Sequence, residues 1–178
     1  MARSGWIWTA LTACFLFATD APVMTAAQAQ SGSVTGATIT WYGIYQAEEI
    51  KKEQDAGAAG GTHRTSTNVK PPAVNSDRIP IADNRRFGFG FKLVGEPASA
   101  RVKLKTVQKI PSPGVLNTVT GKRSMSGQHE STVTIGSTAA FTGFVIGKAA
   151  NVPPGNWTFE IWHDNRKLAE KTFALYRP

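Results

Sequence analysis

Residues 156–163, NWTFEIWH, are followed by Asp164-Asn165-Arg166 and then by residues 167–176, KLAEKTFALY. Both longer segments alternate apolar and polar residues and are rich in aromatic side chains, as strands with one buried face are. The three residues between them are turn formers, so the sequence predicts a tight antiparallel hairpin. The face predicted to point to the core carries Trp157, Phe159, Ile161, Phe173 and Leu175, whereas Trp162 points the other way.

The residues just before this hairpin predict a corner. Pro154-Gly155 is a turn dipeptide, and Trp157 follows the glycine by two residues. In immunoglobulin-like sandwiches an aromatic residue commonly occupies the corner that opens the penultimate strand. Gly155 and Trp157 are therefore expected to form that structural corner.

The strongest strand signal upstream is RFGFGFKLV, residues 86–94, in which three phenylalanines and a leucine alternate with other residues. The glycines between the phenylalanines leave the opposite face bare, which predicts a close neighbour or a bulge there. RVKLKTV, residues 101–107, alternates in the same way, with Val102 and Leu104 pointing inward. Further strands are expected at residues 34–45, 131–135 and 141–146.

No amphipathic helical period extends over more than two turns, so the predicted fold is all-β. The simplest architecture that accommodates these strands is an immunoglobulin-like antiparallel β-sandwich, formed by residues 30–178 as a single domain. Residues 47–83 are the exception, since they pass through an Ala-Gly run and stay polar as far as Pro71-Pro72. They predict one long flexible loop, either functional or disordered.

The amino-terminal 29 residues predict a secretory signal. Arg3 precedes the apolar run of residues 6–18, and Ala27-Gln28-Ala29 has the small-x-small pattern of a cleavage site after Ala29. The apolar run is shorter than the ~20 residues that a bilayer span requires. The expected location is therefore periplasmic or secreted.

The only cysteine, Cys14, lies inside this signal, and Leu11-Thr12-Ala13-Cys14 matches the box that precedes the acylated cysteine of bacterial lipoproteins. The apolar run continues beyond it with Phe15-Leu16-Phe17, which favours ordinary cleavage over lipidation. A membrane contact is thus expected only peripherally, or through Cys14 if the chain is lipidated. The mature chain can form neither a disulfide nor a thiolate metal site.

The net charge of +8 survives cleavage, because Arg3 and Asp20 cancel. Such a charge favours anionic partners: lipopolysaccharide, anionic phospholipid, acidic glycans or acidic proteins. A basic chain often binds nucleic acid, but an exported chain rarely meets any, so nucleic acid is not an expected partner.

The two ends of the chain resemble a known family. They are similar to a bacterial envelope family catalogued only as a domain of unknown function. The similar segments are Ile39-Thr40-Trp41-Tyr42-Gly43-Ile44-Tyr45 at one end and residues 154–162 and 167–173 at the other. The resemblance implies a secreted, single-domain, immunoglobulin-like protein. It transfers no site residues.

The sequence contains no recognisable catalytic or metal-binding motif. His63, His129 and His163 lack ligand-spaced partners, so no metal site and no cofactor are predicted. No serine lies in a G-x-S-x-G motif, and only a triad assembled by folding, such as Asp83 with His129 or His163, would supply nucleophilic catalysis. The sequence predicts no catalytic residue.

Binding signals are stronger. Arg101, Lys103 and Lys105 form an outward basic row on one strand, and Arg85-Arg86 adds a basic pair, so together they predict an anion-attracting face. The alternative is a solvated face that discourages edge-to-edge pairing of strands. Trp41, Tyr42 and Trp162 are candidates for an aromatic surface, although burial is the more frequent fate of such residues.

The sequence therefore predicts a non-enzymatic binding or interaction module of the cell envelope that recognises an anionic or protein partner. Two alternatives stay open. One is a small periplasmic hydrolase whose residues come together only in the fold. The other is a chaperone-like protein that donates a strand to its partner through an exposed sheet edge.

Overall fold

The computed structural model describes residues 32–178; the predicted signal, Cys14 and the cleavage site after Ala29 lie outside this part of the chain. Within it the chain forms strands and one short 3-10 helix, Ala149–Asn151. The strands are β1 (Ser33–Ile44), β2 (Gln46–Gln54), β3 (Thr62–Lys70), β4 (Arg78–Pro80), β5 (Arg86–Glu96), β6 (Arg101–Lys109), β7 (Val115–Leu116), β8 (Arg123–Ser124), β9 (Ser126–Thr134), β10 (Ala140–Val145), β11 (Gly155–His163) and β12 (Arg166–Tyr176). No described helix is long and apolar enough to cross a membrane.

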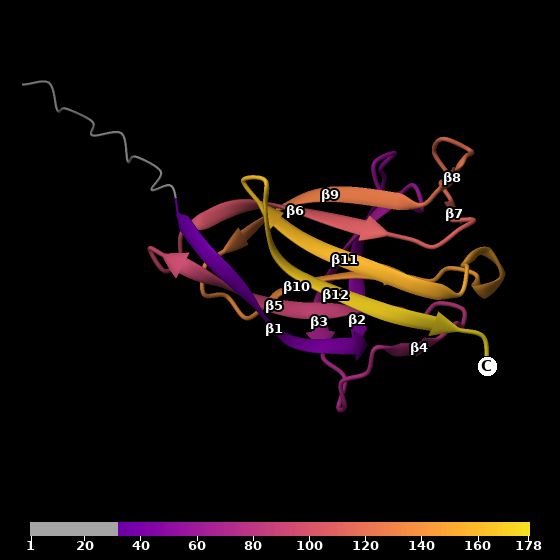
Figure 1. The fold of residues 1–178 in the computed structure, drawn as a ribbon, viewed down its shortest axis with the longest axis horizontal. Helices are drawn as coiled ribbons and strands as arrows, with labels where there is room; N and C mark the ends of the chain where they lie inside the picture. The colour runs from indigo at the N-terminus through magenta and orange to yellow at the C-terminus, as the bar shows by residue number, and fades with distance from the viewer. Residues whose placement is uncertain (1–31) are drawn as a thin grey trace, which may run out of the picture.

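Two sheets make up the body of the molecule (Figure 1). One has three strands in the order β1-β5-β10, and the other has five in the order β4-β12-β11-β6-β9. Every pairing in them is antiparallel except that of the short β4 with β12. The predicted immunoglobulin-like antiparallel β-sandwich is confirmed.

The hairpin of β11 and β12 forms as predicted, with Trp157 opposite Phe173 in the register. Its turn is shorter than expected, because Arg166 already belongs to β12 and only two residues connect the strands. Asp164 and Asn165 have φ values of 45° and 62°. Two successive positive φ angles are the mark of a type I′ turn, whose twist matches that of the flanking strands.

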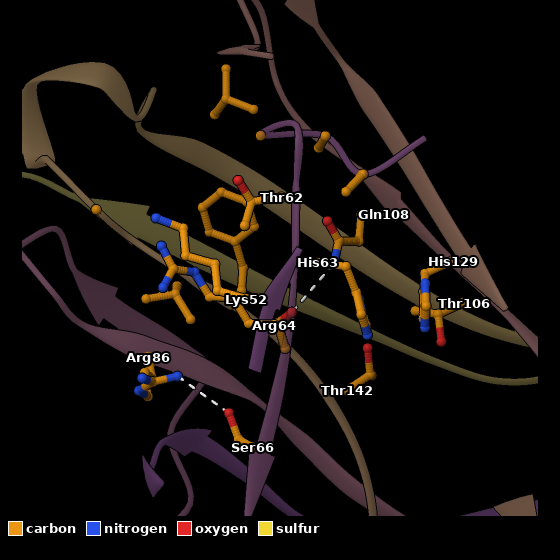
Figure 2. A pocket seen from close by; sticks show the side chains of 18 of the residues that line it. Lys52, Thr62, His63, Arg64, Ser66, Arg86, Thr106, Gln108, His129 and Thr142 are labelled. Atoms are coloured by element: carbon orange, nitrogen blue, oxygen red, sulfur yellow. Dashed lines mark hydrogen bonds between the residues drawn. The ribbon is translucent and has the colours of Figure 1, made fainter. Parts of the chain in front are cut away.

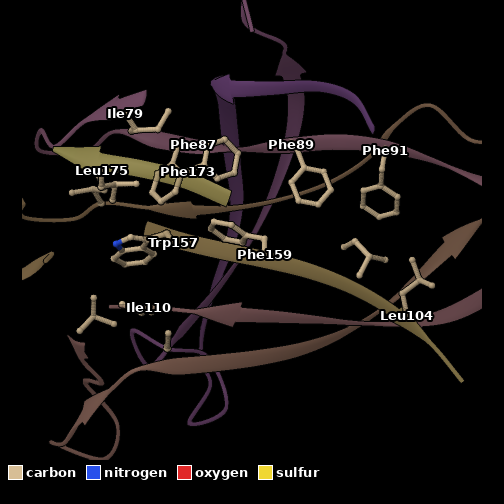
Figure 3. Packing of buried hydrophobic residues seen from close by; sticks show 14 of the residues in the cluster. Ile79, Phe87, Phe89, Phe91, Leu104, Ile110, Trp157, Phe159, Phe173 and Leu175 are labelled. Carbon is tan, nitrogen blue, oxygen red and sulfur yellow. The ribbon is translucent and has the colours of Figure 1, made fainter. Parts of the chain in front are cut away.

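The core lies between the two sheets and is dominated by aromatic rings (Figure 3). Phe87 is at its centre: its ring centroid lies 5.5 Å from that of Phe173, 5.6 Å from that of Phe159 and 5.8 Å from that of Trp157. The rings meet edge to face, which is a favoured geometry for aromatic pairs. Phe89, Phe91, Leu93, Val102 and Leu104 are also buried, as their alternation predicts.

The predicted corner is present at the start of β11. Trp157 has no exposed surface, and its indole N–H donates a 3.1 Å hydrogen bond to the carbonyl of Pro153. Gly155 has a φ of 120°, a conformation that residues with a side chain rarely adopt. The indole thus closes the turn onto the core and satisfies its own polar group.

Glycines meet side by side in the three-stranded sheet, where Gly43, Gly88 and Gly143 are in register across β1, β5 and β10. A Cβ atom on Gly90 would lie 2.1 Å from the indole nitrogen of Trp41, and one on Gly143 would lie 2.9 Å from the Tyr45 hydroxyl. Aromatic side chains therefore pack against bare backbone on the outer face of this sheet. The close neighbour predicted beside the glycines of residues 86–94 is confirmed.

Residues 47–83 differ from the prediction of a long loop without secondary structure. Residues 47–70 belong to the hairpin of β2 and β3, which forms a two-stranded sheet, and β4 follows it. The Ala-Gly run is the turn of the hairpin, where Asp55 Oδ1 accepts a hydrogen bond from the Gly57 N–H. The prediction was wrong because both strands are polar on both faces, so neither shows the alternation by which a half-buried strand is recognised.

The tip of the β2–β3 hairpin is fixed to the body of the molecule. The buried side-chain amide of Asn117 donates to the carbonyls of Ala56 and Ala58, at 3.0 and 2.9 Å. The Gln128 N–H of β9 donates to the carbonyl of Gly57 at 2.9 Å. These bonds hold the hairpin across the open side of the sandwich, where it runs transverse to the other strands (Figure 1).

Candidate functional site

A cleft of about 680 Å³ lies beneath the β2–β3 hairpin. Its walls come from the hairpin, from β10 at the edge of the three-stranded sheet, and from β6 and β9 at the edge of the five-stranded sheet (Figure 2). This volume is typical of sites that hold small molecules or short segments of larger ones. The cleft is therefore the candidate site.

The floor of the cleft is the polar continuation of the inner face of β6 and β9. Along β6 the inward positions change from Val102 and Leu104 to Thr106 and Gln108, and the last two line the cleft. Thr106 is paired in register with His129 of β9, another lining residue. The sandwich thus has an apolar core at one end of these strands and a polar cavity at the other.

The charge of the cleft is basic. The residues that line it include four cationic side chains, Lys52, Arg64, Arg86 and Lys148, and no carboxylate among the residues that the structure describes. Glu49 lies just outside, forms an ion pair with Arg64 and lies 3.7 Å from Arg86. The hydrogen bond from Arg64 holds the pKa of Glu49 below its usual range.

Arg86 and Tyr45 connect the cleft to the three-stranded sheet. The Arg86 guanidinium donates a 3.5 Å hydrogen bond to the Ser66 hydroxyl of β3, which joins β5 to the hairpin (Figure 2). Tyr45 is buried, and this burial raises the pKa of its phenol to about 12, against the opposing charge of Arg86. Tyr45 is therefore a neutral hydrogen-bonding group over the whole physiological pH range.

His63 and His129 meet face to face in the cleft. Their ring planes lie within 16° of parallel with 3.5 Å between centroids, and they come from β3 and β9. The pKa of His63 lies below the ordinary histidine value because burial disfavours its charged form and because His129 would repel that charge, against the attraction of Asp55 and Glu53. Asp55 Oδ2 lies 3.8 Å from the Nδ1 of His129. The contact joins the hairpin to the five-stranded sheet.

This stacked pair predicts acid sensitivity. An unfolded histidine titrates near about pH 6.5, whereas folded His63 titrates lower, so below that pH the unfolded chain binds more protons than the folded one. The free energy of unfolding therefore falls as the pH drops through this range, and His63→Gln is expected to remove part of that dependence. Urea unfolding of both proteins at about pH 7.5 and about pH 5 measures the difference.

Ser66→Ala is the matched control, because it changes a lining residue of the same strand that does not titrate. It is expected to keep the acid dependence of the parent protein. An equal dependence in His63→Gln and the parent would contradict the assignment.

The predicted basic face is divided in the structure. Arg101 and Lys103 are exposed on the outer face of β6, and Lys105 is partly covered there by the Trp162 ring, 5.9 Å from its ammonium. Arg85 instead donates to the carbonyl of Pro80 at 2.7 Å, and Arg86 lies in the cleft. The five residues do not form one surface.

The three aromatic candidates are also apart. Trp41 covers Gly90 on the outer face of the three-stranded sheet, and Tyr42 packs against the core with the Lys171 ammonium 3.7 Å from its ring centroid. Trp162 lies on the outer face of the five-stranded sheet, where its N–H donates to the carboxylate of Glu160 at 2.9 Å. Each ring has its own packing partner, and the three do not make a continuous surface.

Glu160 is a buried carboxylate that the sequence analysis missed. It is 1% exposed and accepts hydrogen bonds from Lys109 at 2.7 Å and from Trp162. Burial alone would raise the pKa of this carboxyl, but the hydrogen bonds and the charges of Lys109 and Lys167 hold it below the usual value. The signal was an acid between two apolar residues of a strand, Phe159 and Ile161, a position where a lone charge requires partners.

The histidines considered for catalysis separate into two places. His163 lies away from the cleft, where its Nδ1 is 2.9 Å from the carbonyl of Lys103 and its Nε2 is 3.2 Å from Asp164. Asp83 accepts a hydrogen bond from the Ala149 N–H, whereas the carboxylates paired with His129 and His163 within residues 32–178 are those of Asp55 and Asp164. Over residues 32–178 no group of three or more histidine, cysteine or acidic side chains could hold a metal ion.

Sequence reasoning considered His63 and His129 separately and did not place them together. Their proximity depends on the β2–β3 hairpin folding back over β9, and this contact joins residues far apart in the chain. A signal existed in β6 and β9, where the inward-facing period continues through Thr106, Gln108 and His129 after the apolar residues end. A polar extension of a core face marks a place where the sandwich opens.

The fold and the cleft together define an immunoglobulin-like β-sandwich protein with a basic site at one side. The model of a family described as "Domain of unknown function (DUF3859)" matches residues 34–175, and the chain belongs to this family. The family resemblance seen in the two ends of the sequence is thus confirmed.

The chain is also similar to two proteins of known structure. An immunoglobulin-like protein from Pseudomonas aeruginosa matches at 18% identity and a TM-score of 0.49, over 84% of this chain and 99% of its own. A β-glucosidase from Erythrobacter marinus matches at 16% identity and a TM-score of 0.34, over 79% of this chain and 16% of its own. No curated protein matches.

Proposed function

We propose that this protein is an exported, non-enzymatic binding module whose cleft beneath the β2–β3 hairpin holds an anionic ligand. The observation that carries the proposal is the lining of the cleft: four cationic side chains and no carboxylate among the described residues. A concave site of one charge sign attracts and retains ligands of the opposite sign.

The cations of the cleft are arranged so that a ligand has groups to bind. Arg64 and Arg86 are held in place by Glu49 and Ser66. For Lys52 and Lys148, by contrast, no carboxylate of residues 32–178 lies within ion-pair distance. Two fixed guanidinium groups and two unpaired ammonium groups favour binding of carboxylate, sulfate or phosphate.

A binding role is favoured over hydrolysis by the surroundings of the two cleft histidines. Each has the other as its ring neighbour, and no serine or threonine hydroxyl of the described residues is hydrogen-bonded to either. A nucleophile needs an adjacent base within hydrogen-bond reach. The signal-like amino terminus further supports action in the periplasm, where anionic glycans, lipids and proteins are available.

The test compares two changes of equal charge. Lys52→Glu with Lys148→Glu is expected to weaken binding of an oligogalacturonate probe by about tenfold or more, because both cations face the cleft. The matched control is Lys103→Glu with Lys105→Glu, which reverses the same charge on the outer face of β6. Calorimetry at low and high salt, with a neutral oligosaccharide as the second probe, measures both.

If Lys103→Glu with Lys105→Glu abolishes binding and Lys52→Glu with Lys148→Glu does not, the anion-binding site lies on the basic row of β6 and not in the cleft. Equal weakening in both variants would indicate attraction by net charge alone. Absence of binding of both the oligogalacturonate and an acidic peptide by the parent protein at low salt would reject the proposal.

A further inference from the structure

One strand edge faces the cleft. β10 is the last strand of the three-stranded sheet, so its far side pairs with no other described strand. Phe141, Gly143 and Val145 of β10 all line the cleft. An unpaired edge of this kind presents a row of backbone N–H and C=O groups to whatever lies beside it.

The register shows which backbone groups point outward. The Ile146 N–H donates to the carbonyl of Arg85, directly beyond the pair formed by Val145 and Arg86. In an antiparallel ladder, hydrogen-bonded and non-bonded pairs alternate. Phe144 and Thr142 therefore bond to β5, whereas the backbone groups of residues 141, 143 and 145 point away from it, toward the cleft.

The backbone carbonyl of Gly143 already has a hydrogen-bond partner on the cleft side of β10. The side-chain amide of Gln108 donates a 3.3 Å hydrogen bond to the carbonyl of Gly143. This is the bond that the N–H of an added strand would make. The β2–β3 hairpin does not supply such a strand, because β2 and β3 pair only with each other within residues 32–178.

We propose that the ligand of the cleft is an extended acidic peptide segment, which binds as an added strand along the outer edge of β10. The inference rests on the proposed function and names the partner of the same site. Main-chain hydrogen bonds to residues 141, 143 and 145 supply the pairing, and acidic side chains of the segment contact Lys52, Arg64 and Lys148.

The backbone edge is the reason to favour a peptide over an acidic glycan. Both ligands satisfy the cations, but only a peptide carries N–H and C=O groups at the spacing of a strand edge. The edge of the five-stranded sheet at β9 is less available for an added strand, because the Gln128 N–H of β9 is hydrogen-bonded to the carbonyl of Gly57. β10 is thus the edge at which a strand can be added inside the cleft.

The experiment measures binding of a synthetic peptide of alternating glutamate and valine that is long enough to span β10. Two further peptides carry N-methyl groups, either on all glutamate nitrogens or on all valine nitrogens. Successive N–H groups of a strand point to opposite edges, so at least one methylated peptide is expected to bind about tenfold more weakly than the parent peptide. A lysine and valine peptide is expected not to bind.

A matched pair of variants tests the protein side. Val145→Pro removes an N–H that points out of the sheet, a position where an edge strand tolerates proline, and is expected to weaken peptide binding about tenfold. Val145→Ala keeps the N–H, so it is expected to bind the peptide more tightly than Val145→Pro does. Near-ultraviolet circular dichroism checks that both variants are folded, and the methylated peptides need no variant at all.

The outcomes separate this inference from the proposed function. If oligogalacturonate binds and is lost in Lys52→Glu with Lys148→Glu, but the acidic peptide does not bind, the cleft holds an acidic glycan and the added strand is rejected. Equal binding of both methylated peptides and the parent peptide also rejects it. If neither acidic probe binds, the proposed function itself fails.

Discussion

Replacement of Phe87 by alanine is expected to lower the free energy of unfolding by about 3–5 kcal/mol. Phe87 has no exposed surface, and its ring meets those of Phe159, Phe173 and Trp157 from the opposite sheet edge to face. Alanine would leave a cavity at the centre of the core that the strands on both sides cannot close. Urea unfolding followed by tryptophan fluorescence measures the loss.

Phe87→Leu is the control for this prediction. It keeps most of the buried volume and loses the edge-to-face contacts, so it is expected to cost much less than Phe87→Ala. Similar losses in both variants would mean that the aromatic contacts, and not the cavity, dominate. A loss below about 1 kcal/mol for Phe87→Ala would contradict the central position of this ring.

Gly88→Ala is expected to destabilise the protein by about 3 kcal/mol or more, although it adds one methyl group. The added Cβ would lie 2.1 Å from the carbonyl oxygen of Thr142 and 2.6 Å from the Cα of Gly143. Both atoms belong to the backbone of β10, so no side-chain rotation relieves the contact. β5 and β10 must separate, and the wall of the cleft moves with them.

Gly36→Ala in β1 is the matched control, because a Cβ there meets nothing within 4 Å. Alanine lowers the conformational entropy of the unfolded chain relative to glycine, so this variant is expected to be neutral or slightly stabilising. The pair is compared by the midpoint of urea unfolding. Equal effects of the two substitutions would show that steric contact with β10 is not the cause.

The longer strands of the sandwich could be predicted from sequence because their apolar residues alternate, whereas β4 was placed in the predicted loop and only the end of β9 was expected. Phe87, Phe89 and Phe91 alternate strictly, and the turn at Asp164-Asn165 fixes the register of the last hairpin. The corner at Trp157 follows from a turn dipeptide and an aromatic residue at a fixed spacing. These features depend on residues close in the chain, and the sequence shows them directly.

The candidate site could not be predicted because it depends on contacts between distant residues. β2 and β3 lack a buried face, so their polar sequences resemble a loop and give no sign that the hairpin folds over β9 and β10. His63 and His129 are brought together only by that fold-back. The basic row of β6 was visible in the sequence, whereas Lys52, Arg64, Arg86 and Lys148 come from four separate segments.

The bare backbone of the three-stranded sheet has a consequence for how this sequence can change over evolutionary time. Trp41 fits only because residue 90 has no side chain, and the Tyr45 hydroxyl approaches residue 143 for the same reason. Trp41 and residue 90 therefore form a pair in which a larger residue at one position requires a smaller one at the other, and these two positions are expected to vary together or not at all. A Cβ atom at position 143 would also lie 2.5 Å from the carbonyl oxygen of Phe87, so position 143 is expected to stay glycine whatever residue occupies position 45.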